Sequence, residues 1–210
     1  MKLRIAAIAA LALLSACRHQ GDVLQGGVFT VRSACPVAGI PAGTGDITLF
    51  NPPNSTDARA IDVTATITDV RNVCQDSGND IVSTMTFTVL GQRRDAGAAR
   101  QVVLPYFDVA LQGGSRVVAK QIGQLALNFA PGSNHAWTRV QANIRVNRGA
   151  ATLPENVRRI LTRERKPGDP QAAVDPLSDP AVRAAVANAT FEHLVGFQMT
   201  QDQLRYNATR

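Results

Sequence analysis

The sequence predicts a mainly β protein: an antiparallel β-sandwich followed by a C-terminal α-helical appendage. Between residues 28 and 147, apolar and polar residues alternate with a period of two in several runs, as in strands with one buried face. Clusters of glycine, proline, asparagine and serine separate these runs and predict turns. After about Gly149 the pattern changes to helical spacing with capping residues, which predicts helices.

Seven runs have the character of strands: 28–32, 46–50, 61–68, 84–89, 103–111, 116–129 and 137–146. The run 61–68 is typical, because Ile61, Val63, Ala65 and Ile67 alternate with aspartate and threonine. In the run 103–111, Pro105 lacks the backbone N–H that a central strand donates to its neighbouring strand. We therefore expect an edge strand or a bulge at Pro105.

Four polar clusters predict the turns between strands: 51–54, 76–79, 112–115 and 131–134. About seven strands joined by such turns resemble the layout of immunoglobulin-like and fibronectin type III sandwiches. This resemblance is one of layout, and the sequence does not fix the strand order.

The C-terminal quarter predicts three short helices. Thr152 with Glu155 forms a possible capping box for a helix over 153–166. A proline-rich linker follows at about 166–180. Asp179 can cap a second helix that begins at Pro180 and carries apolar residues as far as Val195. Thr200 with Gln203 forms a possible capping box for a short third helix.

The first 16 residues have the order of a secretory signal peptide. Lys2 and Arg4 precede an apolar stretch over residues 5–14, and small residues follow. This stretch is shorter than the roughly 20 residues that a helix needs to cross a bilayer. We expect it to be a removable signal.

The sequence Leu14-Ser15-Ala16-Cys17 resembles the lipobox of bacterial lipoproteins. The resemblance implies that the Cys17 thiol receives a diacylglyceryl group, that cleavage occurs before Cys17, and that its new amino group is acylated. Arg18 follows where aspartate in many such lipoproteins causes retention at the inner membrane, so we expect the outer membrane. The protein would face the periplasm, with exposure at the cell surface as the alternative. The alternative is an ordinary signal peptide with a chance cysteine.

These signals divide the chain into a signal peptide (1–16), a lipidated tether (17–27), a β-sandwich domain (28–150) and a helical segment (151–210). A hydrophobic fraction of 45% indicates a packed core. Removing Lys2 and Arg4 lowers the formal net charge from +6 to +4, so the mature protein is mildly basic. Its location and its few aromatic residues argue against a nucleic acid partner.

Assigning Cys17 to the lipid leaves Cys35 and Cys74. In an oxidising envelope such a pair predicts a disulfide, which would stabilise the fold by about 3 to 4 kcal/mol. A redox or metal pair is the weaker alternative, because no CxxC spacing occurs and histidines are few.

The sequence offers little for catalysis. Ser133, His135 and Asp108 can be combined into a triad, but no strained nucleophile turn surrounds Ser133, and a plain loop is the better interpretation. His193 falls within the predicted second helix. No zinc spacing, phosphate-binding loop or dinucleotide motif occurs, so we predict no metal, no cofactor and no enzyme activity.

Two surface features are candidate binding sites. The first is a basic cluster of Arg158, Arg159, Arg163, Arg165 and Lys166, which would meet a phosphate surface or an acidic protein, or would simply be a solvated helix end. The second is a set of apolar residues in the last two predicted helices: Phe191, Leu194, Val195, Phe197, Leu204 and Tyr206. These would recognise a partner, or fold back onto the sandwich.

The leading functional prediction is a non-catalytic structural or accessory subunit of a cell-envelope assembly, with another envelope protein as its partner. The alternative is a stand-alone lipoprotein that binds a glycan, lipid or peptide, for which Tyr106 and Trp137 are the aromatic residues of interest. An enzyme is the third possibility.

Overall fold

A computed structural model describes residues 33–53, 55–163, 168, 170 and 173–209. The predicted signal peptide, the tether and the strand expected at 28–32 lie outside the described residues. So do Arg165 and Lys166 of the basic cluster.

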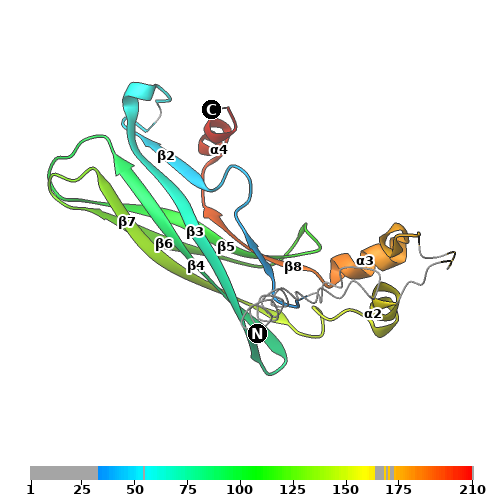
Figure 1. Cartoon of the computed structure of the whole chain (residues 1–210). Coiled ribbons are helices and arrows are strands. Elements are labelled where there is room, and N and C mark those ends of the chain that lie inside the picture. The colour runs from blue at the N-terminus through cyan, green and yellow to red at the C-terminus, as the bar shows by residue number, and fades with distance from the viewer. Residues whose placement is uncertain (1–32, 54, 164–167, 169, 171–172, 210) are drawn as a thin grey trace, which may run out of the picture.

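The described chain forms two four-stranded sheets, which confirms the predicted β-sandwich (Figure 1). The first sheet has the order β1-β8-β5-β6, with strands β1 (Val37–Gly39), β8 (Phe191–Phe197), β5 (Arg100–Gln112) and β6 (Arg116–Phe129). The second has the order β2-β3-β4-β7, with strands β2 (Asp46–Phe50), β3 (Ile61–Ser77), β4 (Asp80–Arg93) and β7 (His135–Asn147). Neighbouring strands are antiparallel except β1 and β8.

Helices occupy the ends of the sandwich. The α-helices are α2 (Glu155–Thr162), α3 (Pro180–Asn188) and α4 (Gln201–Thr209), and two 3-10 turns are η3 (Ala58–Ala60) and η4 (Pro176–Ser178). Figure 1 shows α2 and α3 together near the start of β8, whereas α4 lies beside β2. The helical appendage predicted for the C-terminal segment is therefore confirmed.

The core lies between the sheets and uses the predicted alternation. On β4 the side chains of Met85, Phe87 and Val89 are buried, and Leu104, Leu127 and Phe129 face them from the other sheet. Gly91 of β4 allows this close packing, because a Cβ there would lie 2.4 Å from Leu127 Cδ1.

A bulge in β3 reverses which side chains face the core. The register with β4 shifts between Thr68 and Arg71, and Asp69 adopts a φ of 52°. Before the bulge the odd-numbered residues of β3 face inward, and after it Asn72 and Cys74 pair with inward-facing positions of β4. As a result, Val73 is 60% exposed.

Pro105 lies where β5 becomes an edge. The pairing of β5 with β8 runs only from Tyr106 to Gln112, so residues 100–105 pair with β6 alone. The Pro105 carbonyl accepts a hydrogen bond from the Gln198 N–H, immediately after β8 ends. The prediction of an edge at Pro105 is confirmed locally, although β5 is an inner strand beyond it.

The predicted second helix ends earlier than expected. Asp179 caps α3 at the Ala181 N–H and Pro180 is its first residue, as predicted. The expectation that Phe191, Leu194 and Val195 continue a helix is wrong, because residues 191–197 form the inner strand β8. Phe191, Val195 and Phe197 also fit a period of two, and pairing with β5 decides in favour of the strand.

The two predicted capping boxes have opposite outcomes. At α4 the Thr200 N–H donates to Gln203 Oε1 and the Gln203 N–H donates to Thr200 Oγ1, which confirms the box. At α2 the prediction is wrong. Thr152 Oγ1 donates to the Arg148 carbonyl, and the helix begins at Glu155 without a side-chain cap.

Candidate functional site

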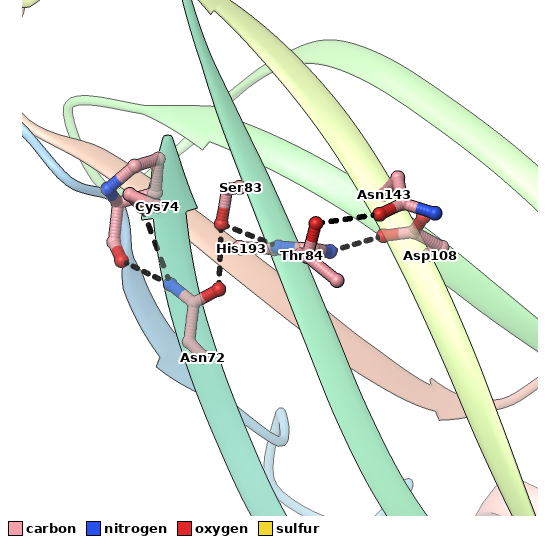
Figure 2. A network of polar contacts seen from close by, with 8 residues as sticks. Asn72, Cys74, Ser83, Thr84, Asp108, Asn143 and His193 are labelled. Carbon is pink, nitrogen blue, oxygen red and sulfur yellow. Dashed lines mark hydrogen bonds and ion pairs between the residues drawn. The ribbon is translucent and has the colours of Figure 1, made fainter. Parts of the chain in front are cut away.

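A chain of four polar side chains, three of them buried and Asn72 half-buried, crosses the core and joins the two sheets (Figure 2). Asn72 and Ser83 belong to β3 and β4 of one sheet, and His193 and Asp108 belong to β8 and β5 of the other. Ser83 Oγ lies 2.9 Å from His193 Nδ1, and His193 Nε2 lies 2.7 Å from Asp108 Oδ1. Ser83 and His193 are fully buried, and Asp108 is 3% exposed.

The direction of each hydrogen bond in this chain follows from its first member. Asn72 Nδ2 donates to the Pro36 carbonyl at 2.9 Å, which fixes the amide orientation and leaves Asn72 Oδ1 as an acceptor. Ser83 Oγ therefore donates its proton to Asn72 Oδ1, at 2.8 Å. Since that proton is already used, His193 Nδ1 must donate to Ser83 Oγ.

The same reasoning leaves one proton between His193 and Asp108. With Nδ1 protonated, His193 Nε2 either carries a second proton, which makes an imidazolium beside a carboxylate, or accepts a proton from Asp108. Both states give an overall neutral pair with a charge-assisted or short hydrogen bond. Neutrality suits a site buried in the core, where a single charge would be costly.

Ser83, His193 and Asp108 have the composition of a hydrolase triad but not its proton order. In a triad the histidine accepts the serine proton, and the serine faces the substrate. Here the Ser83 proton goes to Asn72, Nδ1 faces the serine, and Ser83 is 0% exposed. This arrangement can bridge two sheets, but it cannot activate Ser83 as a nucleophile.

The triad considered from the sequence is not assembled. Ser133 and His135 bond to each other through the Ser133 hydroxyl and the His135 backbone in a local turn. Asp108 instead pairs with His193. Sequence reasoning placed His193 on a helix and missed it. The alternation of Phe191, His193, Val195 and Phe197 was the signal that could have found it.

The disulfide between Cys35 and Cys74 is present, as predicted, and it lies beside the polar chain. Its Cα atoms are 5.8 Å apart, and Asn72 Nδ2 approaches Cys35 Sγ at 3.6 Å. Cys35 precedes β1 of one sheet, whereas Cys74 belongs to β3 of the other. The covalent bond and the polar chain thus connect the sheets in the same region.

At its other end the polar chain reaches a cavity of about 160 Å³. The cavity lies between strands β6 and β7, each of which ends its sheet, and Asp108 and Tyr106 of β5 form part of its wall. Its lining residues are Tyr106, Asp108, Gln121, Ile122, Gly123, Gln141, Ala142 and Asn143.

Tyr106 covers a glycine in this wall. Gly123 is its cross-strand partner, and a Cβ at Gly123 would lie 2.5 Å from the tyrosine ring, so any other residue would displace the ring. Burial, and secondarily the negative charge of Asp108, raise the pKa of Tyr106 above its ordinary value. Of the two aromatic residues that the sequence suggested for ligand binding, Tyr106 lines the cavity, whereas Trp137 is 69% exposed on β7.

No protein family, curated protein or solved structure matches this chain. The site must therefore be interpreted from its own geometry. Among the described residues, no group of three or more histidine, cysteine, aspartate and glutamate side chains could hold a metal ion. Within the same residues, no helix has the length and apolar character needed to span a membrane.

The basic cluster is partly described. Arg158 forms two hydrogen bonds with Glu155 of the same helix, both 2.8 Å, and Arg159 is exposed near the end of α2. Arg163 follows the helix and is also exposed. Arg158 is therefore already paired within its own helix.

The predicted apolar partner-binding residues divide into two groups. Phe191, Val195 and Phe197 are buried in the core on β8, which corresponds to the alternative of folding back onto the sandwich. Leu194 is half-buried on the outer face of the same strand. On α4, Tyr206 packs edge-on against Phe50 at 5.0 Å, and Leu204 is 41% exposed.

Proposed function

We propose that this chain is a lipid-anchored envelope protein, attached through Cys17 to the outer membrane and serving as a non-catalytic structural or accessory subunit. The observation that supports a non-catalytic role is the direction of the hydrogen bonds between Asn72 and His193. The Ser83 hydroxyl donates its proton to Asn72 and accepts from His193, so it connects the sheets. The anchor rests on the resemblance of residues 14–17 to a lipobox.

The construction of the domain supports a tethered module. A disulfide and a buried polar chain both connect the sheets, so the sandwich can transmit load between an anchor and a partner without opening. The exported location agrees with the disulfide, because such bonds persist in oxidising compartments. The partner in this proposal is another protein of the cell envelope.

Site-specific photo-crosslinking in cells tests the proposal. A photoreactive residue at Leu204 of α4 or at Trp137 of β7 samples two exposed apolar positions, and one at Ala96, in the exposed loop between β4 and β5, is the matched control. We expect one dominant stoichiometric partner, identified by mass spectrometry, from at least one of the first two positions.

A separate substitution tests the lipid anchor. Replacing Cys17 with alanine should move the protein out of the membrane fraction and abolish the crosslink. If the Cys17→Ala protein stays membrane-bound through another route, the lipid anchor is wrong. If neither Leu204 nor Trp137 yields a defined partner, the accessory role is wrong.

A second candidate function is that of a stand-alone ligand-binding lipoprotein. The cavity beside Asp108 favours it. Its volume of about 160 Å³ is below the roughly 300–1,000 Å³ of pockets for drug-sized molecules, so a whole lipid or oligosaccharide does not fit inside it. The cavity suits a group of side-chain size.

A further inference from the structure

Among the described residues that line the cavity between β6 and β7, Asp108 is the only carboxylic acid and none is basic. Gln121 is the cross-strand partner of Asp108 and adds an amide that can accept hydrogen bonds as well as donate them. A cation that enters the cavity therefore meets the carboxyl group of Asp108 and the amide oxygen of Gln121.

One oxygen of Asp108 is available to such a group. Oδ1 is bonded to His193 Nε2, and no hydrogen bond from the described residues reaches Oδ2. The Asp108 side chain is 4% exposed and lies in the cavity wall. Asp108 Oδ2 is not one of the described buried oxygens that lack a partner, so it is open to the cavity, where water or a ligand can donate to it.

The orientation of the His193–Asp108 pair decides which end of it the cavity meets. His193 lies on the side of Ser83 and is not part of the cavity wall, whereas Asp108 faces β7 (Figure 2). In its imidazolium–carboxylate form the pair is a dipole whose negative end points to the cavity, and a cation bound there favours that form.

We propose that this cavity binds an organic cation, namely a protonated amine or guanidinium group that donates hydrogen bonds to Asp108 Oδ2 and to the Gln121 amide oxygen. Charge-assisted hydrogen bonds of this kind are stronger than neutral ones. A cavity of about 160 Å³ holds the head of a lysine or arginine side chain, or a free small amine. The inference deepens the ligand-binding candidate and does not depend on the lipid anchor or an envelope partner.

Methyl NMR of the mature protein in detergent micelles tests the proposal. Ile122 and Ala142 line the cavity and report binding, whereas Ile160 of α2 and Ala151 lie outside the lining set and serve as internal controls. The probes are acetyl-arginine amide and its neutral isostere acetyl-citrulline amide. We expect the arginine probe to shift the two cavity methyls and to bind at least about tenfold more tightly than citrulline.

Substitutions at Gln121 separate charge recognition from folding. Gln121 is exposed at the cavity, so both Gln121→Glu and Gln121→Lys should fold normally. Gln121→Glu should tighten binding of the arginine probe severalfold, and Gln121→Lys should weaken it by a similar factor. Asp108→Asn should abolish the preference for arginine over citrulline, provided that its methyl spectrum remains dispersed.

Two further probes distinguish the sources of the cation. Methylguanidinium that binds as well as a Gly-Gly-Arg-Gly-Gly peptide supports a free small cation. A peptide that binds more tightly supports a basic side chain of a polypeptide, whose backbone also contacts the strand edges. Equal binding of arginine and citrulline, or no shift of the Ile122 and Ala142 methyls by any cation, would overturn the proposal.

Discussion

At the scale of single residues, the core of this protein is specified by polar groups as well as apolar ones. The Asn72 amide, fixed by one backbone carbonyl, sets the direction of the hydrogen bonds as far as Asp108. Ser83, His193 and Asp108 are satisfied only if their neighbours are present, because these three side chains are buried, whereas Asn72 is half-buried. Removing Ser83 or His193 therefore leaves two others unpaired.

Ser83→Ala tests this dependence. The substitution leaves Asn72 Oδ1 and His193 Nδ1 without partners, so we expect a loss of about 2 to 4 kcal/mol in the free energy of unfolding. Thr84→Ala is the matched control on the same strand, because the hydroxyl of Thr84 bonds to Asn143 on the exposed face and should contribute less than about 1 kcal/mol. Urea unfolding followed by circular dichroism measures both. Equal losses would contradict the buried chain.

Arg93 is a second buried polar residue, and it lies at the opposite end of β4. Its guanidinium donates to the carbonyls of Ser133, Ala98, Gly97 and Ala130 and stacks over the Phe129 ring at 5.3 Å. It therefore connects the β4–β5 loop with the β6–β7 loop. The planar guanidinium spreads its donors over three nitrogen atoms and so reaches carbonyls of two loops, whereas a lysine ammonium donates from a single nitrogen.

Arg93→Lys should therefore destabilise the protein by about 2 kcal/mol, because Arg93 is 4% exposed and the shorter set of ammonium donors leaves part of its buried hydrogen bonding unmade. The neighbouring Arg94→Lys is the control, and as an exposed position it should change stability by less than about 0.5 kcal/mol. Thermal unfolding of the two variants is compared with the native protein. A neutral Arg93→Lys would show that solvent replaces the guanidinium.

At the scale of elements, the C-terminal strand β8 contributes most to the fold among the segments after residue 150. It lies between β1 and β5 and places Val195 and Phe197, which are 0% and 1% exposed, in the core. The helix α4 that follows is attached more lightly, through Tyr206 against Phe50 and through Asn207, whose Nδ2 donates to the Gly43 and Asp46 carbonyls.

Two truncations distinguish these elements. A chain that ends at residue 178 lacks β8, and we expect it to unfold or aggregate, because β5 and β1 lose their shared neighbour. A chain that ends at residue 200 lacks only α4 and should remain folded. Size-exclusion chromatography and far-UV circular dichroism measure both. A folded monomer ending at 178 would revive the idea of a separable docking segment.

At the scale of the whole molecule, the two sheets are held together at both ends of the sandwich. Near the Ser83 end the disulfide and the polar chain connect them. Elsewhere Asp62 of β3 forms a bidentate pair with Arg100 of β5, with Nη1 to Oδ1 at 2.7 Å and Nη2 to Oδ2 at 2.5 Å. Hydrogen bonding to Arg100, against the opposing effect of burial, lowers the pKa of Asp62 below its usual value of 3.8.

This ion pair predicts a pH dependence of stability. Because the pKa of Asp62 is lower in the folded protein, the pair stabilises fully above the unfolded value near 3.8, and the effect is lost as the pH falls through the folded value. Both side chains are partly exposed, so the contribution is at most about 1 kcal/mol. Asp62→Asn should be less stable than the native protein at pH 7, and the difference should vanish in strong acid. A difference that is constant from pH 7 to pH 2 would contradict the pair.

Much of the sandwich follows from local sequence. Strands β2 and β6 have the predicted bounds, the turns at Gly78 and Gly113 separate hairpins as expected, and Asp179 and Thr200 begin helices. Each of these features depends on residues within a few positions of one another, so periodicity and capping chemistry are sufficient to predict it.

The site could not be predicted in the same way. His193 and Asp108 are 85 residues apart, and they meet only because β8 pairs with β5. Asn72 and Cys74 face the core only because the bulge at Asp69 shifts the phase of β3, which the alternation of the sequence does not reveal. The cavity likewise forms only because the fold brings β6 and β7, the end strands of the two sheets, next to Asp108 of β5.

The sequence by itself therefore determined the fold class, the hairpins, the pairing of Cys35 with Cys74 and the helix starts at Asp179 and Thr200. These depend on local periodicity, on capping groups and on cysteine number. The tertiary structure alone decided that residues 191–197 are a strand, which way β3 turns its side chains and which polar groups meet. The physical reason is that a short apolar segment fits either period, and long-range pairing and burial select the one that satisfies its neighbours.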